Sequence, residues 1–171
     1  KARVREARGI AAAVKDLPPP PAKVLDVVCN GGHVAMTLRQ RGYDAYGVDL
    51  PGVIDHGLKN YFPGANEYLI PRNLEFDELP GSDYDLVLAL GFIEHLMNWM
   101  RGISELSRVM KKGATLFLTT CNFKAIKGEH WHSTHFLPEM LVSVGAINAL
   151  EHVATVTPDT ATSLQMVFKK R

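Results

Sequence analysis

Cysteine is scarce in this sequence, with only two residues among 171. Two cysteines are too few for the disulfide framework that stabilises small secreted domains. Cys29 and Cys121 both lie in apolar stretches, so we expect two free, buried thiols. Reduced thiols are typical of a reducing compartment, which predicts a cytoplasmic protein.

The sequence also lacks an excess of charge and a long apolar run. It has 19 lysines and arginines against 18 aspartates and glutamates, a net charge of +1. That balance gives no reason to expect a nucleic acid or an anionic membrane as a partner. The longest apolar run, near Leu86–Ile93, has about eight residues, whereas a membrane-spanning helix needs about 20. The N-terminal stretch is basic and amphipathic, so no secretory signal is expected there.

The sequence is long enough for one globular domain, and 46% of its residues are hydrophobic. Lys1–Leu17 carries apolar residues at helical spacing, with arginines between them, and predicts an N-terminal helix with a solvated basic face. Pro18–Pro21 predicts a stiff connector. We therefore expect a single domain over residues 1–171, composed of the helix (1–17), the connector (18–21) and a core (22–171).

In the core, short apolar runs alternate with helical stretches. The expected strands are Lys23–Val28, Asp44–Val48, Asn66–Ile70, Tyr84–Leu90, Ala114–Thr120, Ala146–Val156 and Ser163–Lys169. The expected helices are Gly32–Arg41, Trp99–Met110 (stopped by Lys111-Lys112-Gly113) and Phe136–Val144. This alternation predicts an α/β fold, a three-layer domain with a seven-stranded, mostly parallel sheet. The last two strands are joined only by a short loop, Thr157–Thr162, so one strand near the C-terminus must run antiparallel.

The loop after the first strand is the expected ligand site, because ligands of open α/β sheets bind at the carboxyl ends of strands. Gly31 and Gly32 remove side chains where a ligand would approach, and the following helix N-terminus favours a carboxylate or phosphate. Asp49 ends the second strand 17 residues after Gly32, where a carboxylate can accept both hydroxyls of a ribose. The glycine spacing is not G-x-G-x-x-G, which disfavours a nicotinamide dinucleotide.

A series of segments, in order and spacing, resembles the class I S-adenosylmethionine-dependent methyltransferases. Val24-Leu25-Asp26-Val27-Val28-Cys29-Asn30-Gly31-Gly32 resembles their motif V-L-D-x-G-C-G-x-G. The other matching segments are Gly42–Asp49, Tyr84–Leu88, Phe92-Ile93-Glu94-His95-Leu96 and Ser107–Ala114. The resemblance covers about residues 20–170 and implies a Rossmann-like fold, S-adenosylmethionine as cofactor and S-adenosylhomocysteine as product.

Two motif glycines are replaced, by Val28 and Asn30. Asn tolerates left-handed backbone, but Val28 adds a branched side chain beside the cofactor path. Either the loop shifts slightly and binding survives, or binding is weakened. The cofactor-binding residues that the resemblance implies are Asp26, Asn30, Gly31, Gly32, Asp49, Leu50, Asn73, Leu74, Glu75, Leu90 and Gly91.

Methyl transfer is an in-line displacement that needs a base only if the acceptor must lose a proton. The candidate catalytic residues are His95, in the Glu94-His95 pair, and His132 and His135. The alternative for the two later histidines is a polar lid loop in which His135 caps the next helix. The alternative for Glu94-His95 is a structural role, fixing its loop by hydrogen bonds. The spacing of these histidines is no known zinc signature, so no metal is expected.

The acceptor is weakly determined by the sequence. Base-amino methyltransferases carry Asn/Asp-Pro-Pro-aromatic after the fourth strand, where this chain has Leu90-Gly91-Phe92-Ile93. By family analogy we expect a small-molecule or carbohydrate-like acceptor, methylated at oxygen, with no nucleic acid or membrane partner and a possible homo-oligomer. The loop Pro51–Pro63 is expected to contribute to acceptor recognition. The alternative is a non-catalytic or weakly cofactor-binding domain of the same fold that acts as an interaction module.

Overall fold

The computed structural model describes residues 17–123, 133–157 and 162–171. The helix expected over Lys1–Leu17 lies outside this part of the chain, except for its last residue. Within the described residues, no helix is both long and apolar enough to cross a membrane.

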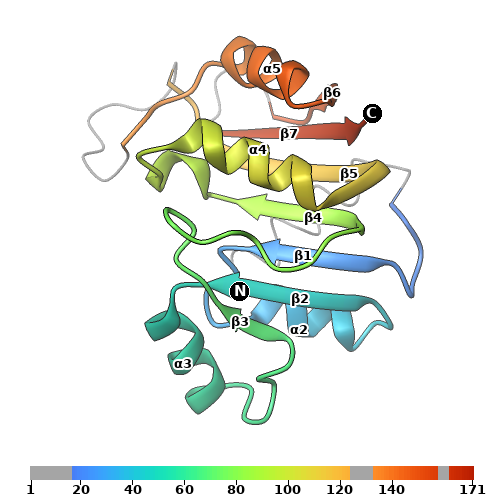
Figure 1. Ribbon diagram of the computed structural model, residues 1–171, viewed down its shortest axis with the longest axis vertical. Coiled ribbons are helices and arrows are strands. Elements are labelled where there is room, and N and C mark those ends of the chain that lie inside the picture. The colour runs from blue at the N-terminus through green and yellow to red at the C-terminus, as the bar shows by residue number, and fades with distance from the viewer. Residues whose placement is uncertain (1–16, 124–132, 158–161) are drawn as a thin grey trace.

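A single seven-stranded sheet forms the centre of the molecule (Figure 1). Its order is β3-β2-β1-β4-β5-β7-β6. The strands are β1 (Lys23–Val27), β2 (Asp44–Asp49), β3 (Leu69–Pro71), β4 (Tyr84–Leu90), β5 (Met110–Cys121), β6 (Leu150–Thr155) and β7 (Ser163–Lys170). Strand β7 is antiparallel to both of its neighbours, while the β3-β2-β1-β4-β5 pairs are parallel. The predicted mostly parallel sheet, with one reversed strand near the C-terminus, is confirmed.

Helices cover the sheet on its two faces, which confirms the predicted three layers. They are α2 (His33–Arg39), α3 (Pro51–Asn60), the short 3-10 helix η1 (Ile93–His95), α4 (Trp99–Val109) and α5 (Pro138–Ile147). In Figure 1, α4 and α5 lie in front of the sheet and α2 lies behind it.

Strand β4 shows why both faces need a cover, because successive side chains of a strand point to opposite sides. Val87 and Ala89 belong to the core cluster beneath α4 and α5. Leu86 and Leu88 belong to a second cluster that includes Val34 of α2. A strand buried on both faces is continuously apolar, as residues 86–90 of β4 are.

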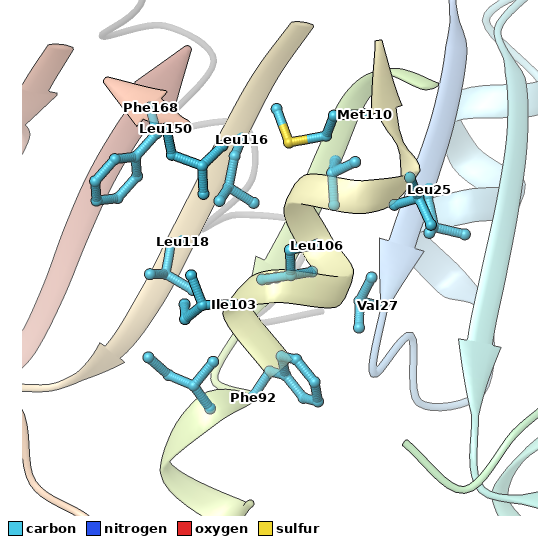
Figure 2. Packing of buried hydrophobic residues seen from close by; sticks show 14 of the residues in the cluster. Leu25, Val27, Phe92, Ile103, Leu106, Met110, Leu116, Leu118, Leu150 and Phe168 are labelled. Carbon is cyan, nitrogen blue, oxygen red and sulfur yellow. The ribbon is translucent and has the colours of Figure 1, made fainter. Parts of the chain in front are cut away.

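Helix α4 anchors the front layer. Ile103 and Leu106 are buried, and Figure 2 shows them lying over the sheet between Val27 of β1 and Leu118 of β5. Their three-residue spacing places both on one side of the helix. The helix begins after Asn98, whose side chain accepts a hydrogen bond from the Arg101 backbone N–H.

The segment Pro51–Pro63 was expected to be a loop, but that expectation is wrong: Pro51–Asn60 forms helix α3. Proline is well tolerated in the first turn of a helix, where its missing N–H has no partner to lose. Gly57 is required by packing rather than by a turn, since a Cβ there would lie 2.8 Å from the carbonyl oxygen of Gly31. The helix therefore packs closely on the loop after β1.

Two predicted boundaries were also wrong. Lys111-Lys112-Gly113 does not follow a helical last turn, because α4 ends at Val109 and β5 already begins at Met110, opposite Tyr84. The strand expected from Ala146 begins only at Leu150, because α5 continues to Ile147. In both places the chain passes from helix to strand within a few residues, where boundary signals are weakest.

Candidate functional site

A cavity of about 270 Å³ lies where β1, β2 and β4 end. Its lining residues are Val28, Asp49, Leu50, Arg72, Asn73, Leu74, Glu75, Phe92, His95 and Leu96. Six of them were predicted as site residues, namely Asp49, Leu50, Asn73, Leu74, Glu75 and His95. Arg72, Phe92 and Leu96 were not, although each directly adjoins a strand end or a predicted residue. Val28 was expected beside the cofactor path but not as a site residue. The volume is just under the 300–1,000 Å³ of typical ligand pockets, which suits the nucleoside part of a cofactor.

The loop between β1 and α2 has a left-handed backbone at every second residue. The φ angles are 58° at Val28, 55° at Asn30 and 84° at Gly32. These are the three positions at which the family motif has glycine, the residue that adopts this conformation without strain. The loop therefore keeps a glycine-type path although two glycines are replaced.

Asp49, 5% exposed, joins this loop to the end of β2. Its Oδ2 accepts the Asn30 backbone N–H at 2.7 Å, and its Oδ1 accepts the Leu50 N–H at 2.8 Å. Its carbonyl accepts the Arg72 N–H at 2.8 Å, which aligns the residues that follow β3.

Close packing holds the glycines in place beside the cavity rather than in its wall. A Cβ on Gly32 would lie 2.6 Å from the Leu69 side chain, and one on Gly31 would lie 3.2 Å from Tyr61. Asp26 is 2% exposed and pairs with Gly47 and Leu88 in the sheet. Asn30, Gly31, Gly32 and Asp26 thus surround or support the cavity without lining it.

The segment after β3 is held by hydrogen bonds from α4. Arg101 donates from Nη1 to the carbonyls of Leu74 and Glu75, and from Nη2 to those of Phe76 and Asp77, at 3.1–3.2 Å. One guanidinium thus binds four successive carbonyls.

The side chains of this segment make further bonds within the wall. Asn73 Oδ1 accepts the Glu75 N–H at 3.2 Å. The Glu75 carboxylate accepts the backbone N–H groups of Met97 at 3.0 Å and Asn98 at 3.1 Å. Glu75 therefore ties the wall of the cavity to the start of α4.

Leu90, the last residue of β4, and Gly91 were predicted as cofactor-binding residues, and neither lines the cavity. Leu90 is fully buried. The Gly91 N–H donates to Thr119 Oγ1 at 2.9 Å. The hydroxyl of the next residue, Thr120, donates to the buried carboxylate of Glu94 at 2.8 Å. These contacts fix β4 and β5 relative to each other at their carboxyl ends.

Of the two candidate histidines in the described residues, His95 lines the cavity and His135 does not. His95 is exposed and lies in η1. Ser133 braces that turn: its N–H donates to the Glu94 carbonyl at 2.8 Å, and its hydroxyl lies 2.6 Å from the Leu96 carbonyl. His135 is half-buried and packs near Phe123, with ring centroids 6.2 Å apart. His132 lies outside the described residues.

Metal and thiol chemistry find no support in the described part of the chain. No group of three or more His, Cys, Asp and Glu side chains there could hold a metal ion. Both cysteines are buried and free, as predicted. Burial raises the pKa of the Cys29 thiol, and the carboxylates of Asp26 and Asp49 raise it further. Burial likewise raises the pKa of Cys121. Neither is an activated nucleophile, which would need a lowered pKa.

Comparison with known proteins places this arrangement in context. The family model described as "Methyltransferase domain" matches residues 2–168. The ubiquinone biosynthesis O-methyltransferase of Hahella chejuensis is 31% identical over 109 residues, which are 60% of this chain and 44% of that protein. The chain thus spans less than two thirds of the length of the curated relatives that it matches first.

Solved structures share the fold. A TehB-like S-adenosylmethionine-dependent methyltransferase from Corynebacterium glutamicum superposes with a TM-score of 0.73 at 20% identity, covering 99% of this chain and 97% of that one. The magnesium protoporphyrin IX methyltransferase of Synechocystis, solved with S-adenosylhomocysteine, gives 0.73 at 17% identity, covering 99% and 83%.

Proposed function

The chain belongs to the methyltransferase domain family of S-adenosylmethionine-dependent methyltransferases, and from this premise we propose that it transfers the methyl group to an oxygen atom of a small-molecule acceptor. The observation that carries the proposal is the cavity at the strand ends, whose wall includes the buried Asp49 carboxylate. The curated relatives are named O-methyltransferases, which supports oxygen as the accepting atom.

The residues of the cavity fit a nucleoside. Asp49 supplies carboxylate oxygens for the ribose hydroxyls, since a carboxylate accepts hydrogen bonds only. Leu50, Leu74, Phe92 and Leu96 supply apolar and aromatic surface for a base. This combination of apolar walls with a few polar groups is typical of small-molecule sites.

When bound, S-adenosylmethionine supplies an already activated methyl group, so the chain itself has little covalent chemistry to perform. Its part is to hold the acceptor oxygen in line, about 3 Å from the methyl carbon, and to keep water out. His95 is the proposed base, because it lines the cavity and an imidazole can accept a proton from a hydroxyl group. His132 and His135 are proposed to contact the acceptor.

Calorimetry on this chain tests the cofactor half of the proposal. S-Adenosylhomocysteine and S-adenosylmethionine should bind one per chain, and NAD should not. A ligand at 100 times its Kd should raise the unfolding free energy by about 2.7 kcal/mol. Absence of binding by either sulfur compound would overturn the proposal.

Labelled S-adenosylmethionine tests the acceptor half. We would offer a catechol, a primary aromatic amine and an aromatic thiol of similar size. Label transferred to the catechol alone supports oxygen, and label on the amine or thiol overturns that part. Cofactor binding without transfer to any acceptor favours the alternative, a cofactor-binding interaction module.

A further inference from the structure

Val28 holds a backbone conformation that its side chain disfavours. Four non-glycine residues in the described part of the chain have positive φ, namely Val28, Asn30, Asp83 and Ala149. Val28 is the only β-branched residue among them. Asparagine and aspartate tolerate the left-handed region, whereas a β-branched residue there is a true outlier. Outliers of this kind concentrate at ligand sites.

The strained residue Val28 lies at the proposed ligand site. Val28 lines the cavity with Asp49, Leu50 and Leu74, and it packs against the main core cluster. Asn30 shares the left-handed backbone but does not line the cavity. Of the two replaced glycines, Val28 is therefore the one that forms part of the wall of the proposed nucleoside site.

The loop has little freedom to move this side chain away. The Cys29 N–H donates to the Val48 carbonyl at 3.0 Å, immediately after Val28. The Asn30 N–H is bound by Asp49, and Gly31 is packed against Gly57 of α3. Backbone bonds and close packing on this side keep Val28 in place, so a ligand must fit around it.

We infer that Val28 limits the affinity of this site for the nucleoside of its cofactor, by filling space that a glycine would leave open. The inference rests on the proposed function of the cavity. A difference of one methylene in an apolar pocket changes binding by about 10-fold or more. Replacing valine by glycine removes three carbons, and the left-handed backbone is already that of glycine.

Three variants separate the volume of the side chain from the strain of the backbone. Val28→Gly removes both, and Val28→Ala reduces the volume but keeps a Cβ at positive φ. Ala149→Gly, between α5 and β6, is the matched control, because it removes a Cβ at positive φ from a residue that does not line the cavity. The probes are S-adenosylhomocysteine and adenosine, measured by calorimetry, together with the melting temperature of each protein without ligand.

We expect Val28→Gly to bind S-adenosylhomocysteine and adenosine at least about 10-fold more tightly than the wild type, with a melting temperature that does not fall. Val28→Ala should gain part of the affinity without the relief of strain. Ala149→Gly should stay within about twofold in affinity. Tightening for S-adenosylhomocysteine but not for adenosine would overturn the assignment to the nucleoside.

The two hypotheses fail in different ways. If the wild type binds cofactor and Val28→Gly binds no tighter, the inference is wrong and the proposed function stands. If only Val28→Gly binds, the inference stands and the proposed function of the wild type fails. If neither protein binds, Val28 is not what limits the affinity, and both are overturned.

Discussion

Asn30 and Asp49, 19 residues apart in sequence, are joined by a 2.7 Å hydrogen bond from the Asn30 backbone N–H to Asp49 Oδ2. The same carboxylate binds the Leu50 N–H through its other oxygen. Asp49 was predicted as a ribose ligand, and the structure adds that it fixes the loop after β1. A ligand on Asp49 and the position of that loop are therefore physically linked.

Asp49→Asn should weaken both the proposed ribose contact and the hydrogen bonds that fix the loop after β1. An amide offers one acceptor oxygen and one donor NH₂, so one of the two backbone N–H groups would face another donor. A buried donor without its acceptor costs about 1–3 kcal/mol. We expect a lower melting temperature and at least about 10-fold weaker binding of S-adenosylhomocysteine by calorimetry. Asp55→Asn, on the exposed side of α3, is the control and should change neither.

How far the sequence could predict the site depends on whether a feature is local. Asp49 was found because a strand end and a glycine loop mark their own positions. The tertiary role of Arg101 left no such mark, because a guanidinium that binds four carbonyls about 25 residues away has no local pattern. Helix α3 was missed for a different reason: the segment Pro51–Pro63 was expected as a loop, whereas Pro51 begins a helix and Gly57 permits its close packing.

Two glycines of α3 offer a matched test of that packing. A Cβ on Gly57 would lie 2.8 Å from the Gly31 carbonyl oxygen, whereas a Cβ on Gly52 meets nothing within 4 Å. Alanine raises helix propensity at both sites. We expect Gly52→Ala to raise the unfolding free energy by about 0.5 kcal/mol. Gly57→Ala should lower it by about 1–3 kcal/mol.

The same pair tests whether α3 supports the ligand loop. Gly57→Ala should displace Gly31 and weaken S-adenosylhomocysteine binding, whereas Gly52→Ala should leave the affinity unchanged. Equal denaturant midpoints for the two variants would show that α3 does not pack closely on the loop.

Arg101→Lys should loosen the cavity wall after β3. An ammonium is a compact charge with three donors and cannot reproduce a planar fork that reaches four carbonyls. We expect a loss of about 1–3 kcal/mol in unfolding free energy. Amide hydrogen exchange should accelerate at residues 73–77, with weaker cofactor binding. Arg171→Lys, at an exposed ion pair with Glu151, should stay within about 0.5 kcal/mol. Unchanged amide hydrogen exchange at residues 73–77 would contradict the role of Arg101 in holding this segment.

Glu105 makes part of the stability depend on pH. Its carboxylate accepts hydrogen bonds from Arg108 and, at 3.0 Å, from the Leu79 N–H. The Arg108 guanidinium holds the pKa of Glu105 below its ordinary value, although partial burial opposes the shift. Because the folded pKa is the lower one, the unfolded chain binds more protons at acidic pH. This stabilisation is complete above the unfolded pKa of about 4.3 and is lost as the pH falls through the folded value.

Glu105→Gln removes the charge but keeps one acceptor oxygen for the Leu79 N–H. We expect the variant to be less stable than the wild type by about 1 kcal/mol at pH 7, as judged by urea unfolding. The difference should shrink below about pH 4.3, where the wild-type carboxylate takes up its proton. Burial raises the Asp85 pKa, but the contacts with Lys111 and Lys23 together lower it by more, so the wild type loses some stability in acid for a second reason. Only the difference between variant and wild type therefore reports on Glu105.

Glu67→Gln, at an exposed position, should show no such pH-dependent difference. A gap between Glu105→Gln and the wild type that stays constant from pH 7 to pH 3 would show that Glu105 acts through its shape rather than its charge.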